Sequence, residues 1–341
     1  MMKTMAAIAL GLTMAAGCTP QTGQEQPAPA PLEASAYVAA PACGPTSVRS
    51  LRELLPDDRL FGAFEVDVQA MQRSPLFLDN KGMLEAEAKE ALDAMKACGV
   101  PLSGVQSIAG GFGDGEKVVL GVQAKGIATP KTLDCLGREI EKATGKAPWA
   151  RTTKVCSTTL DIDGGDSVGF AVGTDMLVVA SKSMAEKVQR RIKGKDKALL
   201  GGQLGWVRHE VDMGSTMWMA GNLPPGAGSA LGSSMSGMSR VGVSVDATRG
   251  LGMKVSAGFA SAADAKAART EVDGLAAQAG LMLPMLGLPS SVADTIVVDS
   301  KGASMTVAMF LSRSDIKALR KFAEDGSGTA APEKKSPRRG I

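Results

Sequence analysis

The sequence is poor in the residues from which many active sites are built. Among its 341 residues there is one histidine, His209, and aromatic residues make up 4% of the chain. A Ser-His-Asp triad or a histidine-rich metal centre would have to be built around His209, and the stretch "HEVDM" lacks the second histidine of a zinc-protease helix. So few aromatic side chains also argue against a stacking platform for sugars or bases. The sequence therefore predicts a protein that is not an enzyme and carries no cofactor.

Other motifs are incomplete. Residues 226–239 are rich in Ser and Gly but contain no G-x-S-x-G, and "GGFGDGEK" at residues 110–117 lacks the ending of a phosphate loop. "DIDGGD" at residues 161–166 lacks the downstream glutamate of an EF-hand loop. Ser314 and Lys317 match S-x-x-K without its partner motifs, so a capped helix explains them. We predict no catalytic residue and no metal site.

Charge gives no case for nucleic-acid binding. The chain has 38 basic and 35 acidic residues, for a net charge of +3, whereas a nucleic-acid surface needs a concentrated basic patch. The basic ending "PEKKSPRRGI" is short, and we interpret residues 326–341 as a disordered, solvated tail.

The N-terminus has the pattern of a secretory signal peptide. Lys3 precedes an uncharged apolar run over residues 5–17, which is too short for a bilayer span of about 20 residues. Residues 1–17 are therefore expected to be removed. The segment "AAGC" that ends at Cys18 resembles the lipobox of bacterial lipoproteins, although Ala15 stands where that family usually has Leu.

This resemblance implies that Cys18 is acylated and becomes the first residue of the mature chain. Thr19 follows instead of the Asp that commonly retains such proteins in the inner membrane, so the resemblance implies the outer membrane. Residues 18–42, rich in Pro, Gln and Ala, are typical of a flexible tether. The alternative is an ordinary secreted protein in which Cys18 is a plain thiol.

The cysteine count is consistent with acylation. Five cysteines are an odd number for an exported protein, and lipid on Cys18 leaves four that can form two disulfides. Three connectivities are possible. We favour Cys135 with Cys156, which would join a helix to the following strand, and Cys43 with Cys98.

Strands followed by capped helices recur along the chain. Helices are predicted to start after Thr129, Ser183, Ser261 and Ser312, the last three with an acidic residue three positions later. Thr129 and Ser261 are 132 residues apart, and Ser183 and Ser312 are 129 apart, which indicates an internal duplication. Between the helices, short turns such as that at Asp114 and Gly115 indicate antiparallel hairpins.

We therefore predict an α+β protein of two duplicated lobes, each an antiparallel sheet with helices on one face. The first lobe is expected at residues 43–200 and the second at residues 201–325.

Methionine is abundant, with 19 residues in the chain. Met217 and Met219 are predicted to share one face of a strand, where methionine commonly fills a core. They could also contribute to a site for acyl chains, to an adaptable partner surface, or to a Cu(I) site.

The sequence thus favours an outer-membrane lipoprotein whose body is a non-enzymatic binding or assembly module with an envelope protein as partner. The first alternative is a carrier of lipid or another apolar ligand. Methionine-based copper binding and an enzyme that uses carboxylates alone are further alternatives.

Overall fold

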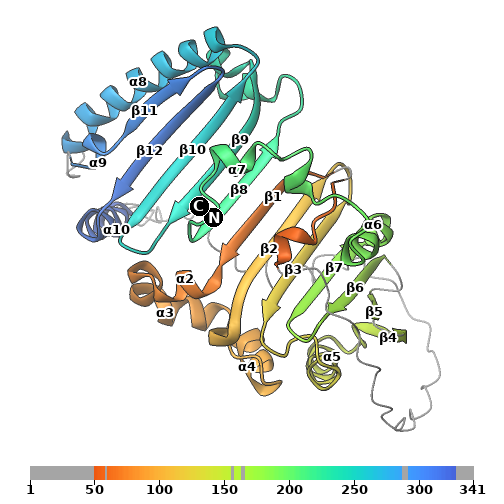
Figure 1. Ribbon diagram of the computed structural model, residues 1–341. Coiled ribbons are helices and arrows are strands. Elements are labelled where there is room, and N and C mark those ends of the chain that lie inside the picture. The colour runs from red at the N-terminus through yellow and green to blue at the C-terminus, as the bar shows by residue number, and fades with distance from the viewer. Residues whose placement is uncertain (1–49, 58–59, 155–156, 163–165, 286–290, 328–341) are drawn as a thin grey trace, which may run out of the picture. The chain divides into compact units, whose positions relative to one another are not determined.

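The structure, a computed structural model, describes residues 50–57, 60–154, 157–162, 166–285 and 291–327. It is of the α+β class, with helices and antiparallel strands, as predicted. Contacts divide the chain into two units (Figure 1). Unit 1 comprises Met1–Leu60 and Lys81–Leu199, and unit 2 comprises Phe61–Asn80 and Leu200–Ile341. The main difference between the predicted first lobe and unit 1 is that residues 61–80 belong to unit 2.

In unit 1 the strands are antiparallel to their neighbours. Their order is β2 (Val105–Gly113), β3 (Val118–Ala124), β7 (Met176–Ser181), β6 (Ser167–Val172), β5 (Ser157–Ile162) and β4 (Trp149–Lys154). The helical elements are η1 (Leu51–Glu53), α4 (Lys89–Ala97), η2 (Leu102–Gly104), α5 (Pro130–Thr144), α6 (Lys182–Ile192) and η4 (Leu199–Gly201), the last of which starts at the final residue of the unit. The hairpin of β2 and β3 turns at Asp114 and Gly115 as predicted, and Gly115 has the positive φ of 68° that a tight turn favours.

The core of unit 1 lies on both faces of its sheet. On one face, Leu133 of α5 packs with Leu160 and Ile162 of β5. Helix α6 packs along β6 and β7 and buries Met184 and Val188.

In unit 2 the strand order is β11 (Val297–Lys301), β12 (Ser304–Leu311), β10 (Leu251–Phe259), β9 (Met238–Asp246), β8 (Met217–Asn222) and β1 (Leu60–Asp67), again antiparallel. Leu60, the first residue of β1, is assigned to unit 1. The helical elements are α2 (Val68–Arg73), the start of α3 (Pro75–Glu87), α7 (Val207–Glu210), η5 (Ala227–Leu231), η6 (Ser233–Met235), α8 (Ala262–Met285), α9 (Ser291–Asp294) and α10 (Arg313–Ser327). Helix α8 packs against one face of the sheet, where Ala265 and Ala268 contact the cluster of Met238, Ala257, Phe259 and Met305.

The two units share an order of strand pairing. A hairpin, β2–β3 in unit 1 and β9–β10 in unit 2, is followed by a helix, α5 or α8. A second hairpin then returns, and its last strand, β7 or β12, pairs with the end of the first hairpin. A helix, α6 or α10, follows in each unit.

Three of the four predicted helix caps are confirmed. The hydroxyl of Thr129 accepts from the backbone N–H of Thr132, and Ser261 and Ser312 accept from the N–H groups of Asp264 and Asp315. The predicted cap at Ser183 is wrong, because α6 already begins at Lys182 after Ser181. Strand β7 continues directly into this helix, so the local cap pattern does not mark its start. When it is counted from Ser181, the residue that precedes α6, the separation to Ser312, which precedes α10, is 131 residues.

Candidate functional site

The sheet of unit 2 has one covered face and one open face, and their chemistry is the reverse of the usual arrangement. We define the covered face by Glu65, Trp218, Ala220, Ser244 and Ser256, all of which are buried. We define the open face by Phe64, Val66, Met217, Met219, Val243, Val245, Met253 and Met309. The register places these eight apolar side chains opposite one another on the other face of the same strands.

The segment around α7 covers the first of these faces. Gly242 allows the close approach, because a Cβ at this position would lie 2.3 Å from Cγ2 of Val211 and 3.4 Å from the ring of Trp206. The hydroxyl of Ser256 donates to the carbonyl oxygen of Glu210 over 2.7 Å. On the same face of the sheet, the indole N–H of the buried Trp218 donates to Glu65 over 3.0 Å. The polar groups of the covered face thus form hydrogen bonds with one another and with the α7 segment.

Arg240 is the strongest polar anchor of the segment. Its guanidinium donates to Glu210 over 2.6 Å and lies 5.5 Å from the ring centroid of Trp206. The Ser304 hydroxyl donates to the same carboxylate over 3.3 Å. Because these groups satisfy one another, we interpret the cluster as structural. His209 is exposed on α7, next to Glu210.

The open face forms two cross-strand rows. The first contains Val243, Met219 and Phe64, and the second contains Met309, Met253, Val245, Met217 and Val66. Helix α8 covers the neighbouring side chains on β11 and β12, Val298 and Val307. Toward β8 and β1 the apolar side chains are only half-buried, and Met219 is 48% exposed. Methionine and valine here remain accessible to a partner or ligand.

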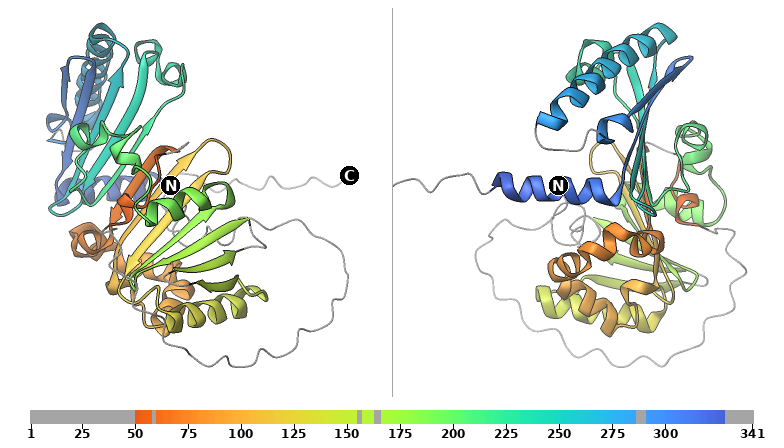
Figure 2. Two further views of the ribbon diagram at one scale, coloured as in Figure 1. Left: turned by 45° about the vertical axis from the view of Figure 1, so that its right-hand side comes forward. Right: turned by 90° about the vertical axis from the view of Figure 1, so that its left-hand side faces the viewer.

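Helices α8 and α10 stand at opposite ends of this face. Helix α8 follows Phe259 at one end of β10, and α10 follows Leu311, which pairs with Leu251 at the other end. In Figure 2 (right) both helices extend from the same side of the unit 2 sheet, opposite the green segment of α7. The open face is therefore bounded by α8 at one end and α10 at the other.

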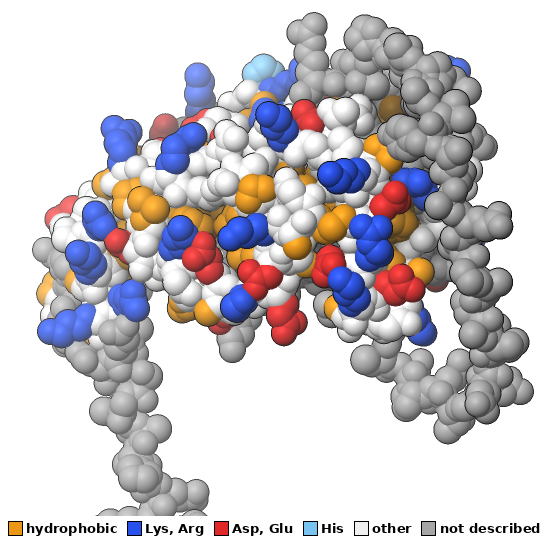
Figure 3. Space-filling model, turned by 90° about the horizontal axis from the view of Figure 1, so that it is seen from below, with side chains coloured by type: hydrophobic (Ala, Val, Ile, Leu, Met, Phe, Trp, Pro, Cys, Tyr) orange, Lys and Arg blue, Asp and Glu red, His pale blue; other side chains and the backbone are white. Residues whose placement is uncertain are grey.

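Helix α10 places basic residues at its end of the face. Over Arg313–Ser327 it contains four basic residues, Arg313, Lys317, Arg320 and Lys321, and three acidic residues, Asp315, Glu324 and Asp325, and the basic ones lie in its N-terminal part. Arg313 donates to Asp79 of α3 over 2.9 Å, and this hydrogen bond lowers the pKa of the Asp79 carboxyl. Asp315 is tied to Ser312 and Ser291. Elsewhere the charges are mixed: on the surface seen in Figure 3, basic and acidic side chains alternate around apolar ones.

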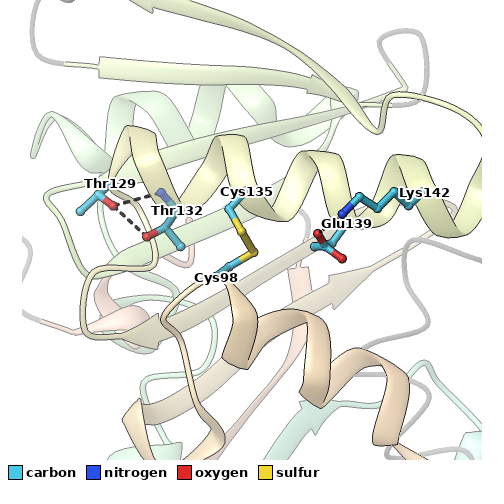
Figure 4. The surroundings of a disulfide bond; sticks show 6 residues. All are labelled: Cys98, Thr129, Thr132, Cys135, Glu139 and Lys142. Atoms are coloured by element: carbon cyan, nitrogen blue, oxygen red, sulfur yellow. Dashed lines mark hydrogen bonds and ion pairs between the residues drawn. A yellow bond between two sulfur atoms is a disulfide. The ribbon is translucent and has the colours of Figure 1, made fainter.

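The predicted cysteine pairs are wrong. Cys98 bonds to Cys135, so neither Cys135–Cys156 nor Cys43–Cys98 is formed (Figure 4). The residue that ends α4, Cys98, lies against the side of α5, with 5.5 Å between the two Cα atoms. The bond closes a separation of 37 residues, and in the chain-entropy model a loop of this length contributes about 3–4 kcal/mol. Cys18, Cys43 and Cys156 lie outside the described residues.

Other predicted features can be located. Asp161 lies on β5, while part of the "DIDGGD" stretch falls outside the described residues. Ser314 bonds to the Ser312 hydroxyl over 2.7 Å at the start of α10, which fits the interpretation of a capped helix. In the part of the chain that the structure describes, no group of three His, Cys, Asp or Glu side chains could hold a metal ion. No helix in that part is long and apolar enough to span a bilayer.

The open face as a whole was not predicted, although Met217 and Met219 were named as possible parts of a site for acyl chains or of a partner surface. The shared face of Met217 and Met219 was predicted, because alternation in a strand fixes this. The alternation of side chains in β8, β9 and β10 does not indicate which face of the sheet the α7 segment covers. Small side chains at Ala220 and Gly242 are a signal of close backbone approach on the covered side.

Comparisons with known proteins add little. The sequence matches no protein-family model, and a search of curated proteins finds no match. A solved structure titled "Structure of crystal form I of TP0453" aligns with a TM-score of 0.45 and 8% sequence identity, covering 81% of this chain and 99% of that chain. A likeness of this size does not establish a common fold, so the site is interpreted from its own residues.

Proposed function

We propose that this chain is a lipoprotein anchored in the outer membrane through acylated Cys18, and that its body is a non-enzymatic binding module of the cell envelope. The observation that carries the binding role is the open face of unit 2. Its contiguous methionine, valine and phenylalanine side chains are half-buried, with Met219 48% exposed, whereas Glu65, Trp218, Ala220, Ser244 and Ser256 on the other face of the same strands are buried.

The energetics favour a binding role for this surface. Burial of apolar surface contributes roughly 25 cal/mol per Å², so a sheet normally turns its apolar face to its own core. Contiguous exposed apolar patches on soluble domains commonly mark interaction sites. Methionine suits a site that adapts to its partner, because its side chain is unbranched and flexible.

The open face also favours the second candidate, a carrier of lipid or another apolar ligand. Both functions would use the same eight side chains and differ in what is bound. A protein partner would bury a wide area with a polar rim, whereas a carrier would bind one small molecule per chain.

We also propose that the two units arose by duplication. The shared order of strand pairing and the separations of 132 and 131 residues between corresponding helix starts support this origin. In this proposal α8 corresponds to α5, and α10 corresponds to α6.

The anchor is tested by mass spectrometry and fractionation. The N-terminal peptide of the mature protein should begin at Cys18 and carry acyl chains. Cys18→Ser should release the protein from the membrane fraction. Thr19→Asp is the matched control, because it should retain the lipid but move the protein to the inner membrane. An unmodified Cys18 thiol would refute the anchor.

The binding role is tested by affinity capture from solubilised membranes. Met219→Asp places a charge in the open face and should abolish capture of a specific partner. Val297→Asp is the control, because Val297 is 60% exposed but lies on the opposite face of β11. Equal capture by both variants would contradict a role for the open face.

A further inference from the structure

We propose that the open face binds the two acyl chains of a single anionic phospholipid, with the headgroup at α10. This proposal rests on the proposed function, because it names the ligand of the same surface. Of the two candidate functions, it assumes that the chain is a carrier of an apolar ligand.

The dimensions of the face fit acyl chains. From β10 across β9 and β8 to β1 there are three strand spacings, or about 14 Å at about 4.8 Å each. One leaflet's acyl chains are about 15 Å long, half of the roughly 30 Å hydrocarbon thickness of a bilayer. The two rows of side chains are two residues apart along the strands, or about 7 Å. Two chains can therefore lie side by side, each along one row.

The chemistry of the face fits the same ligand. All eight side chains are apolar, so nothing on the face itself would pair with a polar group in the ligand. A bound molecule must therefore be apolar over the length of the rows, because an unpaired polar group would lose its hydrogen bonds to water. Sugars and nucleotides fail this condition, whereas acyl chains meet it.

The charge at one end gives the headgroup its position. The second row ends at Met309 on β12, two residues before Leu311 and four residues before Arg313, where α10 starts. Lys317 and Lys321 are four residues apart on α10, so they lie on the same side of the helix, and both are exposed. Lysine ammonium groups complement the phosphate of a lipid. An anionic headgroup at this end would leave its chains directed toward β8 and β1.

The test uses the full chain with Cys18→Ser, so that the protein's own lipid does not compete. The protein is incubated with phosphatidylcholine vesicles that contain self-quenched fluorescent phosphatidylglycerol, and the vesicles are then removed by flotation. We expect fluorescent lipid in the soluble protein fraction, and native mass spectrometry should find one phospholipid per chain. All variants keep the same N-terminal segment, so any contribution of this segment to lipid extraction is the same in every variant.

Two substitutions separate the apolar and the charged contributions. Met219→Asp should reduce lipid extraction roughly tenfold, whereas Val297→Asp should not change it. Lys317→Glu with Lys321→Glu should reduce extraction of phosphatidylglycerol severalfold but leave extraction of a fluorescent diacylglycerol, which lacks the phosphate, unchanged. Circular dichroism and urea unfolding confirm that each variant is folded.

The outcomes distinguish this inference from the proposed function. Equal extraction by Met219→Asp and Val297→Asp, or protein that floats with the vesicles without extracting lipid, would overturn the inference. If lipid is not extracted but capture of a protein partner depends on Met219, the inference fails and the proposed function stands. If lipid is extracted but Cys18 carries no acyl chain, the inference stands and the anchor fails.

Discussion

At the residue scale, Glu65 and Trp218 show how the covered face is held. They are cross-strand partners on β1 and β8, Trp218 is 1% exposed, and its indole N–H donates to the Glu65 carboxylate. Trp218→Phe would remove the donor of this buried hydrogen bond to the carboxylate. We expect the free energy of unfolding to fall by about 1–3 kcal/mol, measured by urea denaturation.

Trp206→Phe provides the comparison for this prediction. The Trp206 indole N–H donates to Asn222, and both residues are only half-buried, so water can replace the lost donor. Its effect should therefore be smaller. A Trp218→Phe variant with the stability of the parent would show that the buried pair contributes nothing to the fold.

The cysteines permit a second prediction at this scale. With Cys98 bonded to Cys135, acylation of Cys18 would leave Cys43 and Cys156, one of the pairs that the cysteine count allows. We expect peptide mapping of the oxidised protein without reductant to find these two cysteines joined. Free thiols at both positions, or a linkage of either to Cys18, would contradict the prediction.

At the scale of elements, the capping box of α10 provides a prediction on pH. Ser312 accepts from the N–H of Asp315, and the Asp315 carboxylate accepts from the hydroxyl and the N–H of Ser312. These bonds, the one from the Ser312 hydroxyl first, lower the pKa of Asp315 in the folded state. Its stabilising contribution is therefore complete above the unfolded pKa of about 3.9 and is lost as the pH falls through the folded pKa.

Thermal unfolding at different pH values tests this contribution. Asp315→Asn should lower the melting temperature near neutral pH, and the difference from the parent should shrink as the pH falls below about 3.9. The other carboxyl groups are common to both proteins. A difference that stays constant down to strongly acidic pH would show that the charge of Asp315 does not stabilise the cap.

The caps also show why some elements could be predicted and others could not. The starts of α5, α8 and α10 depend on residues within one turn, so local sequence determines them. The bond between Cys98 and Cys135 depends on how α4 and α5 pack, and the open face depends on which side of the sheet the α7 segment covers. Helix packing and the choice of the covered face depend on contacts between distant segments, so the pattern within one strand or helix does not predict them.

At the scale of the whole molecule, the main difference from the expected organisation is the set of chain segments that form unit 2. The sequence suggested two consecutive lobes, but β1 and α2 belong to the unit formed by residues 200–341. Strand β1 pairs with β8 over five residue pairs, from Gly62 with Gly221 to Val66 with Met217. Pairing of strands distant in sequence is set by tertiary structure, which capping and hairpin signals do not reveal.

This organisation predicts that residues 200–341 cannot form unit 2 alone. Without residues 61–80, β8 would become an unpaired edge, Trp218 would lose Glu65, and Arg313 would lose Asp79. The isolated fragment should show no cooperative urea transition. Replacing residues 81–199 with a Gly/Ser linker keeps the chain order and restores β1, so this shortened chain should unfold cooperatively. If the fragment of residues 200–341 unfolds with the same midpoint as the shortened chain, β1 is dispensable and unit 2 is the product of the C-terminal segment alone.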